Sequence, residues 1–207
     1  DRVWQDAITA IHADLREWLY RMSEDETGFV PWRFELSFGL RDMEKADPHS
    51  TEEPIEVRSG FRLRGCIDLL ERNAKGELRV VDHKTGRVRI PEGAIIGGGE
   101  SLQPLLYGLA TKVLFEGAPA VFGELHYCTV AGGFEKRGFA LKDNALLIAD
   151  RLAETIDGSV ERGQLPAAPK EDACRLCDFK AICGHHEEQR TERKPDIPAL
   201  TWLRSLT

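Results

Sequence analysis

The sequence has no apolar run that could cross a membrane. Over its 207 residues, no window approaches the roughly 18 uninterrupted apolar residues of a spanning helix. Residues 1–4 carry neither the basic flank nor the apolar core of a secretory signal. The chain also starts without Met, so we expect it to be a piece of a longer protein, and we expect no membrane partner.

An excess of basic residues is also missing. The 28 Lys and Arg residues are outnumbered by 35 Asp and Glu, which gives a net charge of −7. Proteins that wrap nucleic acid mainly by electrostatic attraction carry the opposite balance. The deficit lowers the expected affinity for nucleic acid. It does not exclude an enzyme that cuts it, because active-site carboxylates add negative charge and a tethered partner can supply affinity.

A disulfide framework is excluded by the number and placement of the cysteines. Of the five, Cys66 and Cys128 stand alone, whereas Cys174, Cys177 and Cys183 cluster in the C-terminal part. An odd count with three thiols so close together is a metal-ligand pattern. Thiols kept for metal imply a reducing compartment, so we expect the cytoplasm. The two lone cysteines are interpreted as small buried hydrophobes.

The periodicity of apolar residues predicts alternating helices and strands. Ser101 is a suitable N-cap for the second of the long helices, and residues 73–76 form a turn. The expected helices cover residues 2–22, 101–115 and 143–162, and the expected strands cover 32–38, 55–58, 61–70, 78–83, 120–131 and 134–141.

The hairpin around residue 75 places two carboxylates close together. Asp68 lies on its outgoing strand and Asp82 on its return strand. A five-residue loop sets them directly opposite and a four-residue loop one position off, which in both cases leaves the side chains roughly 5–8 Å apart. Lys84 follows two residues after Asp82 and projects from the same face.

Two carboxylates this close repel each other unless a cation lies between them. Carboxylate oxygens suit Mg²⁺ or Mn²⁺, and the backbone carbonyl of His83 is placed to add an oxygen ligand, with its side chain on the opposite face. The alternative is a surface ion pair between Asp82 and Lys84. A buried strand that ends abruptly at Thr85 favours the site, because sites are commonly built at such strand ends.

The helix that follows adds two polar side chains. Gln103 and Tyr107 are four residues apart and share one face. They could hold a phosphate or orient Lys84. For Tyr107, packing in the core with its hydroxyl at the rim is the slightly favoured alternative.

These motifs together resemble the PD-(D/E)xK nuclease superfamily, in particular its RecB-like and AddB-like branch of bacterial recombinational exonucleases. The resemblance spans about residues 32–184. It is carried by Glu35 within residues 34–39, by residues 65–68 and 81–86, by Gln103 and Tyr107, and by Cys174, Cys177 and Cys183.

The resemblance implies an α/β fold with a restriction-endonuclease-like core, a central mixed β-sheet flanked by helices and a Cys-rich C-terminal segment. It implies that Asp68 and Asp82 hold Mg²⁺ or Mn²⁺ and that Lys84 positions or polarises the attacking water. Gln103 and Tyr107 match the auxiliary helix motif. The expected substrate is DNA, and the expected partner is a helicase domain or subunit of the same repair complex.

The expected divisions are a nuclease core over residues 1–170, truncated at its N-terminus, a Cys-rich segment over 171–186 and a tail over 187–207. The family places a metal-binding His on an upstream helix, four residues after a Gly. His12 has Ile8 at that offset and does not match. Asp82 also stands where many relatives carry Glu.

Many relatives use the same cysteine triplet, with a distant upstream Cys, to hold a structural 4Fe–4S cluster, which normally takes four thiolates. No fourth thiol is evident in this sequence, so we expect it outside the chain. A Cys₃His zinc site completed by His185 or His186 is the less favoured alternative.

Two other functions compete with a nuclease. A catalytically degenerate nuclease fold could serve as a DNA-binding or structural scaffold, although the presence of Asp68, Asp82 and Lys84 argues against lost chemistry. A zinc-binding interaction module would account only for the C-terminal cysteines.

Overall fold

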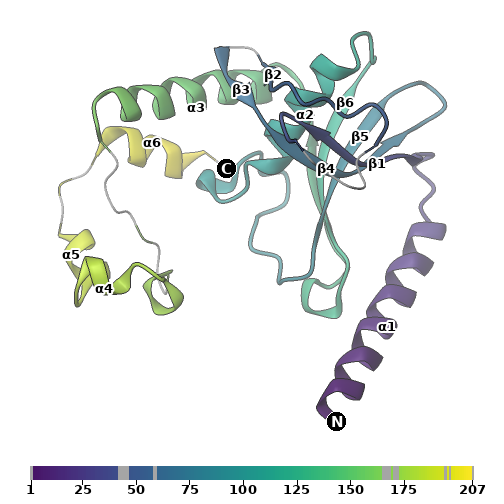
Figure 1. Cartoon of the computed structure of the whole chain (residues 1–207), viewed down its shortest axis with the longest axis horizontal. Helices are drawn as coiled ribbons and strands as arrows, with labels where there is room; N and C mark the ends of the chain where they lie inside the picture. Colours follow the sequence, from purple (N-terminus) through teal and green to yellow (C-terminus); the bar gives the residue numbers. More distant parts are fainter. Residues whose placement is uncertain are drawn as a thin grey trace.

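A five-stranded mixed sheet forms the centre of the molecule in the computed structural model (Figure 1). The expected α/β fold, with a central mixed sheet flanked by helices, is thereby confirmed. Among the strand pairs of this sheet that the structure describes, β5–β6 is the parallel one. The strands lie in the order β1 (Val30–Phe38), β4 (Gly65–Arg72), β5 (Leu78–Lys84), β6 (Val121–Tyr127) and β7 (Lys136–Ala140). The structure describes residues 2–41, 47–57, 60–164, 169, 173–193, 195 and 197–206.

The β4–β5 hairpin has the five-residue loop that sets the two carboxylates opposite each other. Its last strand pair is Arg72 with Leu78. Asn73 holds the turn, because its side-chain oxygen accepts the backbone N–H groups of residues 75 and 77, both at 3.0 Å. Continued one step beyond the Leu69–Val81 pair, the register places Asp68 across from Asp82.

Helix α2 (Gln103–Leu114) is the crossover that a parallel β5–β6 pair requires. It crosses β6 at Gly123, where any Cβ would collide with the backbone carbonyl of Pro104. The prediction that Ser101 caps this helix is wrong. Leu102 occupies the cap position in a helical conformation with no side-chain bond, and Pro104 instead removes one of the donors that a first turn leaves unpaired.

The main core lies between α2, α3 (Asp143–Glu161) and the sheet. Helix α6 (Pro198–Ser205) packs near this core against η2 (Gly97–Gly99), where Gly98 N–H donates to Leu206 O at 2.5 Å. The C-terminal tail therefore docks on its own fold. The remaining short helices are η3 (Val130–Gly132), η4 (Ala173–Leu176), α4 (Lys180–Cys183) and α5 (Glu187–Glu192).

Helix α1 (Arg2–Ser23) confirms the expected helix but buries none of its residues. It extends away from the sheet (Figure 1), and large apolar side chains such as Trp4 stay exposed. Its C-terminal half nevertheless touches the sheet, since the Trp18 ring packs edge-on against His83 at 5.1 Å. None of the helices that the structure describes is long and apolar enough to span a membrane.

Three strands differ from the sequence expectation. The strand expected over 120–131 ends at Tyr127, and residues 130–132 form η3 instead. The strand expected over 61–70 is divided into β3 (Arg62–Leu63), which pairs with β2 (Ile55–Glu56) in a separate small sheet, and β4. In β1, Phe34 is 58% exposed although Leu36 and Phe38, at alternate positions of the same strand, are fully buried. Glu35 next to it has a positive φ of 50°, and this left-handed residue breaks the alternation.

Substituting Gly123→Ala tests the close crossing of α2 over β6. We expect a loss of about 1–3 kcal/mol in the free energy of unfolding, because the added methyl group meets backbone that cannot rotate away. Urea denaturation measures this loss. Gly86→Ala is the matched control, since nothing lies within 4 Å of its added Cβ. Equal stability of both variants would contradict the close crossing.

Candidate active site

Asp82, Lys84 and Gln103 form a continuous polar chain between β5 and α2. The Asp82 side chain is only 5% exposed, and its Oδ2 lies 2.5 Å from Lys84 Nζ. Lys84 Nζ also donates to Gln103 Oε1 at 2.6 Å. Gln103 can reach the lysine because α2 begins at that residue. The structure thus brings together three of the side chains that the sequence singled out.

Asp68 approaches the same strand end from β4. Its Oδ2 accepts the backbone N–H of His83 at 3.0 Å and lies 3.7 Å from His83 Nδ1. The His83 ring packs between two other aromatic rings, Trp18 at 5.1 Å and His126 at 6.3 Å. His83 therefore contacts Asp68 through its backbone N–H and its ring nitrogen, and the ring also packs between α1 and the sheet.

The two carboxyl groups have pKa values shifted in opposite directions. Burial raises the pKa of Asp82, and the nearby charge of Asp68 adds to this, although Lys84 opposes it. The hydrogen bond from His83 holds the pKa of Asp68 below its usual value, against the opposing effect of burial. Environments that separate the pKa values of paired titratable groups are typical of catalytic sites.

This arrangement fits a hard divalent cation. Asp82 Oδ2 is buried against Lys84 Nζ, and an ionised carboxylate has about four lone-pair sites, so Asp82 keeps acceptor capacity for a cation. Across the described part of the chain, no three His, Cys, Asp or Glu side chains are grouped to hold a metal. Asp68 and Asp82 would supply two ligands. Mg²⁺ commonly binds through one or two carboxylates and completes its shell with water and substrate phosphate.

Tyr107, on α2, lies next to Gly65 at the start of β4. Its ring packs edge-on against Phe38 at 6.1 Å and contacts the main core. A Cβ on Gly65 would come within 2.9 Å of the Tyr107 ring. Gly65, three residues before Asp68, thus leaves room for this ring. The Tyr107 ring therefore packs against the core, as the favoured alternative in the sequence analysis has it.

Glu35 adds a third carboxylate near this end of β4. Cys66 Sγ donates to Glu35 Oε2 at 3.4 Å. Burial, followed by the charges of Glu35 and Asp68, raises the pKa of Cys66 to about 12, so its thiol stays neutral. Sequence reasoning recorded Glu35 as a motif residue without a role. Its unusual backbone conformation is not visible in a pattern of alternating apolar residues.

The family model described as the PD-(D/E)XK nuclease superfamily matches residues 1–184. The chain belongs to the PD-(D/E)XK nuclease superfamily. The five-stranded mixed sheet with flanking helices is consistent with the restriction-endonuclease-like fold of that superfamily. A search of curated proteins gives no match.

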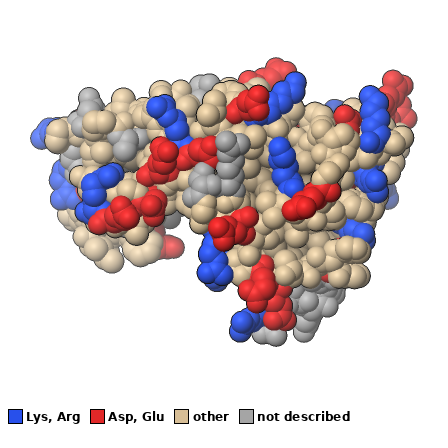
Figure 2. Space-filling model, turned by 90° about the horizontal axis from the view of Figure 1, so that it is seen from above, with Lys and Arg blue, Asp and Glu red and all other residues tan. Residues whose placement is uncertain are grey.

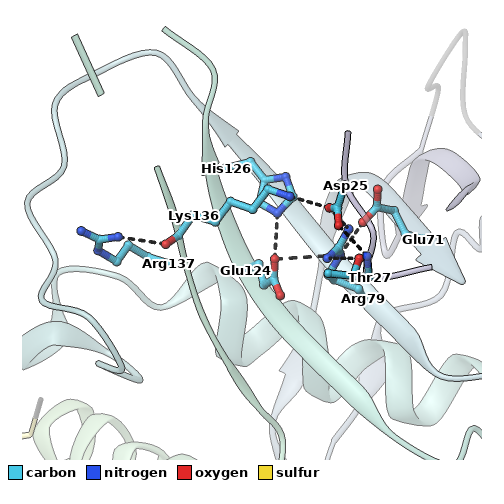
Figure 3. Close-up of polar contacts among 8 residues, drawn as sticks. All are labelled: Asp25, Thr27, Glu71, Arg79, Glu124, His126, Lys136 and Arg137. Carbon is cyan, nitrogen blue, oxygen red and sulfur yellow. Dashed lines mark hydrogen bonds and ion pairs between the residues drawn. The ribbon is translucent and has the colours of Figure 1, made fainter. Parts of the chain in front are cut away.

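A buried ion network lies on the back of this nuclease sheet (Figure 3). At its centre the Arg79 side chain, 4% exposed, donates to Glu71 at 2.5 Å and to Asp25 at 3.2 Å. Glu124 lies 3.9 Å from Arg79 and 2.8 Å from His126 Nε2. The network ties β4, β5 and β6 to the segment between α1 and β1. Sequence reasoning missed it, because charged residues on alternate strand positions resemble a solvent-exposed face.

Protonation in the network follows from burial and neighbours. Burial lowers the pKa of His126, so the imidazole is neutral near pH 7. At Asp25 burial opposes ionisation, but hydrogen bonds from Lys136 and Thr27 outweigh it and hold its pKa far below the usual range. Arg79 and Lys136 therefore both face the ionised carboxylate of Asp25 rather than a protonated histidine.

The three C-terminal cysteines lie in and between η4 and α4 as half-buried free thiols. The backbone N–H of Cys174 donates to Glu188 Oε1 at 3.0 Å. Neither these thiols nor His185 and His186 belong to a metal-holding group among the described residues. The iron–sulfur cluster and the zinc alternative both stay predictions.

Replacing Arg79 with Met tests the importance of the network. Removing one partner of a buried ion pair leaves unpaired carboxylates, so we expect a loss of roughly 3–5 kcal/mol in unfolding free energy. Arg62→Met, at an exposed position, is the control and should change stability by less than about 0.5 kcal/mol. Similar stabilities for the two variants in urea denaturation would show that the network contributes little.

Proposed function

We propose that the chain is a metal-dependent deoxyribonuclease, an exonuclease that acts in DNA repair and recombination. The observation that supports this most directly is the Asp82–Lys84–Gln103 chain opposite Asp68. In a member of the PD-(D/E)XK nuclease superfamily, these residue types have the chemistry that phosphodiester hydrolysis requires. Lost catalytic function would leave no reason to keep a lysine against a buried, incompletely bonded carboxylate.

Asp68 and Asp82 would hold Mg²⁺ or Mn²⁺, with the backbone carbonyl of His83 as a further oxygen ligand. When bound, such an ion makes water a stronger nucleophile and neutralises charge on the phosphodiester transition state. The raised pKa of Asp82 reflects burial without enough hydrogen-bond donors, which a cation would offset.

Lys84 would position the attacking water and stabilise negative charge beside the phosphate. Its Nζ atom is held between two oxygens, Asp82 Oδ2 at 2.5 Å and Gln103 Oε1 at 2.6 Å. A long flexible side chain restrained in this way loses little further freedom when substrate binds. Gln103 is therefore a positioning residue in this proposal, and Tyr107 shapes the wall beside Gly65.

The finer assignments rest on the order of the motifs. Glu35, the two carboxylate motifs, the helix motif and the cysteine triplet follow one another as in the RecB-like and AddB-like branch. That order supports a helicase domain or subunit as partner, a cytoplasmic location, and a structural iron–sulfur cluster completed by a Cys outside the chain. The divisions at residues 170 and 186 belong to the same proposal.

Digestion of end-labelled linear DNA with Mg²⁺ or Mn²⁺ tests the proposed activity. Asp82→Asn should abolish cleavage, and Lys84→Met should lower its rate by roughly a hundredfold or more, as expected for loss of a group that stabilises the transition state. Asp157→Asn, at an exposed position on α3, should cleave like the unsubstituted chain.

Unchanged cleavage by Asp82→Asn and Lys84→Met would refute the site assignment. Binding of DNA without cleavage in either metal would favour the scaffold alternative. Circular dichroism of each variant separates a loss of chemistry from a loss of fold.

A further inference from the structure

We propose that the cleft beside Lys84 binds a single DNA strand, with its phosphates held by Arg87 and Arg89. This inference rests on the proposed nuclease function and names the part of the site that holds the substrate. The cleft has a volume of about 340 Å³. Its lining includes Lys84, Arg87, Arg89, Gln103, Leu125 and Tyr127.

The cleft opens directly onto the candidate active site. Lys84 and Gln103 line it, and the same two side chains form the 2.6 Å bond that extends to Asp82. A strand lying in the cleft would therefore have a phosphate within reach of the lysine. No rearrangement of β5 or α2 is needed to connect the cleft with the carboxylates.

The two arginines are available to a ligand. Both are exposed, and within the described ranges neither has an ion pair or side-chain hydrogen bond. Arg79 and Arg137, by contrast, are engaged with acidic or backbone oxygens. A guanidinium group matches the geometry of phosphate oxygens and binds them with two parallel hydrogen bonds.

The charge of the whole molecule makes this local pair more important. The net charge is −7, and Figure 2 shows acidic and basic side chains interspersed over the face in view. Broad electrostatic attraction therefore contributes little to DNA affinity. In the cleft lining, Arg87, Arg89 and Lys84 outnumber the acidic Glu100, so positive charge prevails where a phosphate backbone would enter the site.

The floor of the cleft favours an unpaired strand over a duplex. Ile90, Leu125 and Tyr127 belong to a small apolar cluster, and Tyr127 is 5% exposed. A cationic rim above an apolar floor suits a nucleotide whose base and sugar turn inward while its phosphate stays at the rim. In a duplex the bases are stacked inside the helix and do not reach a recessed floor.

Hydrogen bonds hold the backbone of residues 84–90, which carries the two arginines. Cys128 N–H donates to Lys84 O at 3.0 Å, and Thr129 Oγ1 donates to Thr85 O at 2.9 Å. Arg137 Nε donates to Ile90 O at 3.3 Å from the other side. These bonds fix the backbone on both sides of the arginines, so their charges are presented from a fixed place.

Binding of a fluorescein-labelled single-stranded oligonucleotide tests the proposal without cleavage, with Ca²⁺ in place of Mg²⁺ and anisotropy measured over a range of salt concentrations. The double variant Arg87→Ala/Arg89→Ala should raise Kd roughly tenfold. It should also flatten the plot of log K against log salt by about 1.4, since each lost single-strand phosphate contact accounts for about 0.7. Arg87→Lys/Arg89→Lys should recover part of the affinity.

Lys112→Ala/Lys142→Ala removes the same charge from exposed positions outside the cleft and is the matched control. An equal effect of the two double alanine variants, or an equal loss of single-strand and duplex binding, would overturn the proposal. In the cleavage assay the arginine variant should raise KM with kcat nearly unchanged. If the unsubstituted chain is active and the arginine variant has a normal KM, this inference is refuted but the nuclease function is not. If the binding changes occur as expected but the chain cleaves no DNA, only the nuclease function is refuted.

Discussion

The buried ion pair between Arg79 and Glu71 is the interaction on which the rest of the structure depends. β5 is the middle strand of the sheet, and Arg79 is buried on its back face against carboxylates from β4, β6 and the segment before β1. A buried guanidinium is tolerated only when such partners are held close to it. Three neighbouring parts of the chain are thus fixed to β5, and the position of β5 fixes everything at its carboxyl end.

That carboxyl end carries the candidate active site on the opposite face. Asp82 and Lys84 alternate with Val81 and His83, so one strand has buried charge on both of its sides. The back-face charges are neutralised within the protein. On the front face, Asp82 is paired with Lys84, and among the described residues the cleft arginines have no ion-pair partner. The carboxylates and the cleft arginines thus lie at one end of β5, where a metal and a phosphate would bind on a rigid scaffold.

Local sequence signals were enough to predict the centre of the site. Residues 73–76 predicted the turn, and both of the loop lengths considered placed Asp68 close to Asp82. Strand alternation put Lys84 on the same face as Asp82. The contact from Gln103 to Lys84 was predicted only in outline, because it depends on where α2 begins. The predicted Ser101 cap was wrong by one residue, since Leu102 occupies that position. Glu35 and Arg79 show what a pattern cannot reveal. The first depends on a left-handed backbone residue, and the second on burial by segments distant in sequence.

Binding of Mn²⁺, followed by electron paramagnetic resonance, tests the central claim most directly, because it reports on the carboxylates without requiring catalysis. The account predicts saturable binding by the chain, loss of that binding in Asp68→Asn and in Asp82→Asn, and its retention in Lys84→Met, whose side chain positions water but does not ligate metal. Equal Mn²⁺ binding by the two Asp variants and the unsubstituted chain would contradict a metal site between β4 and β5.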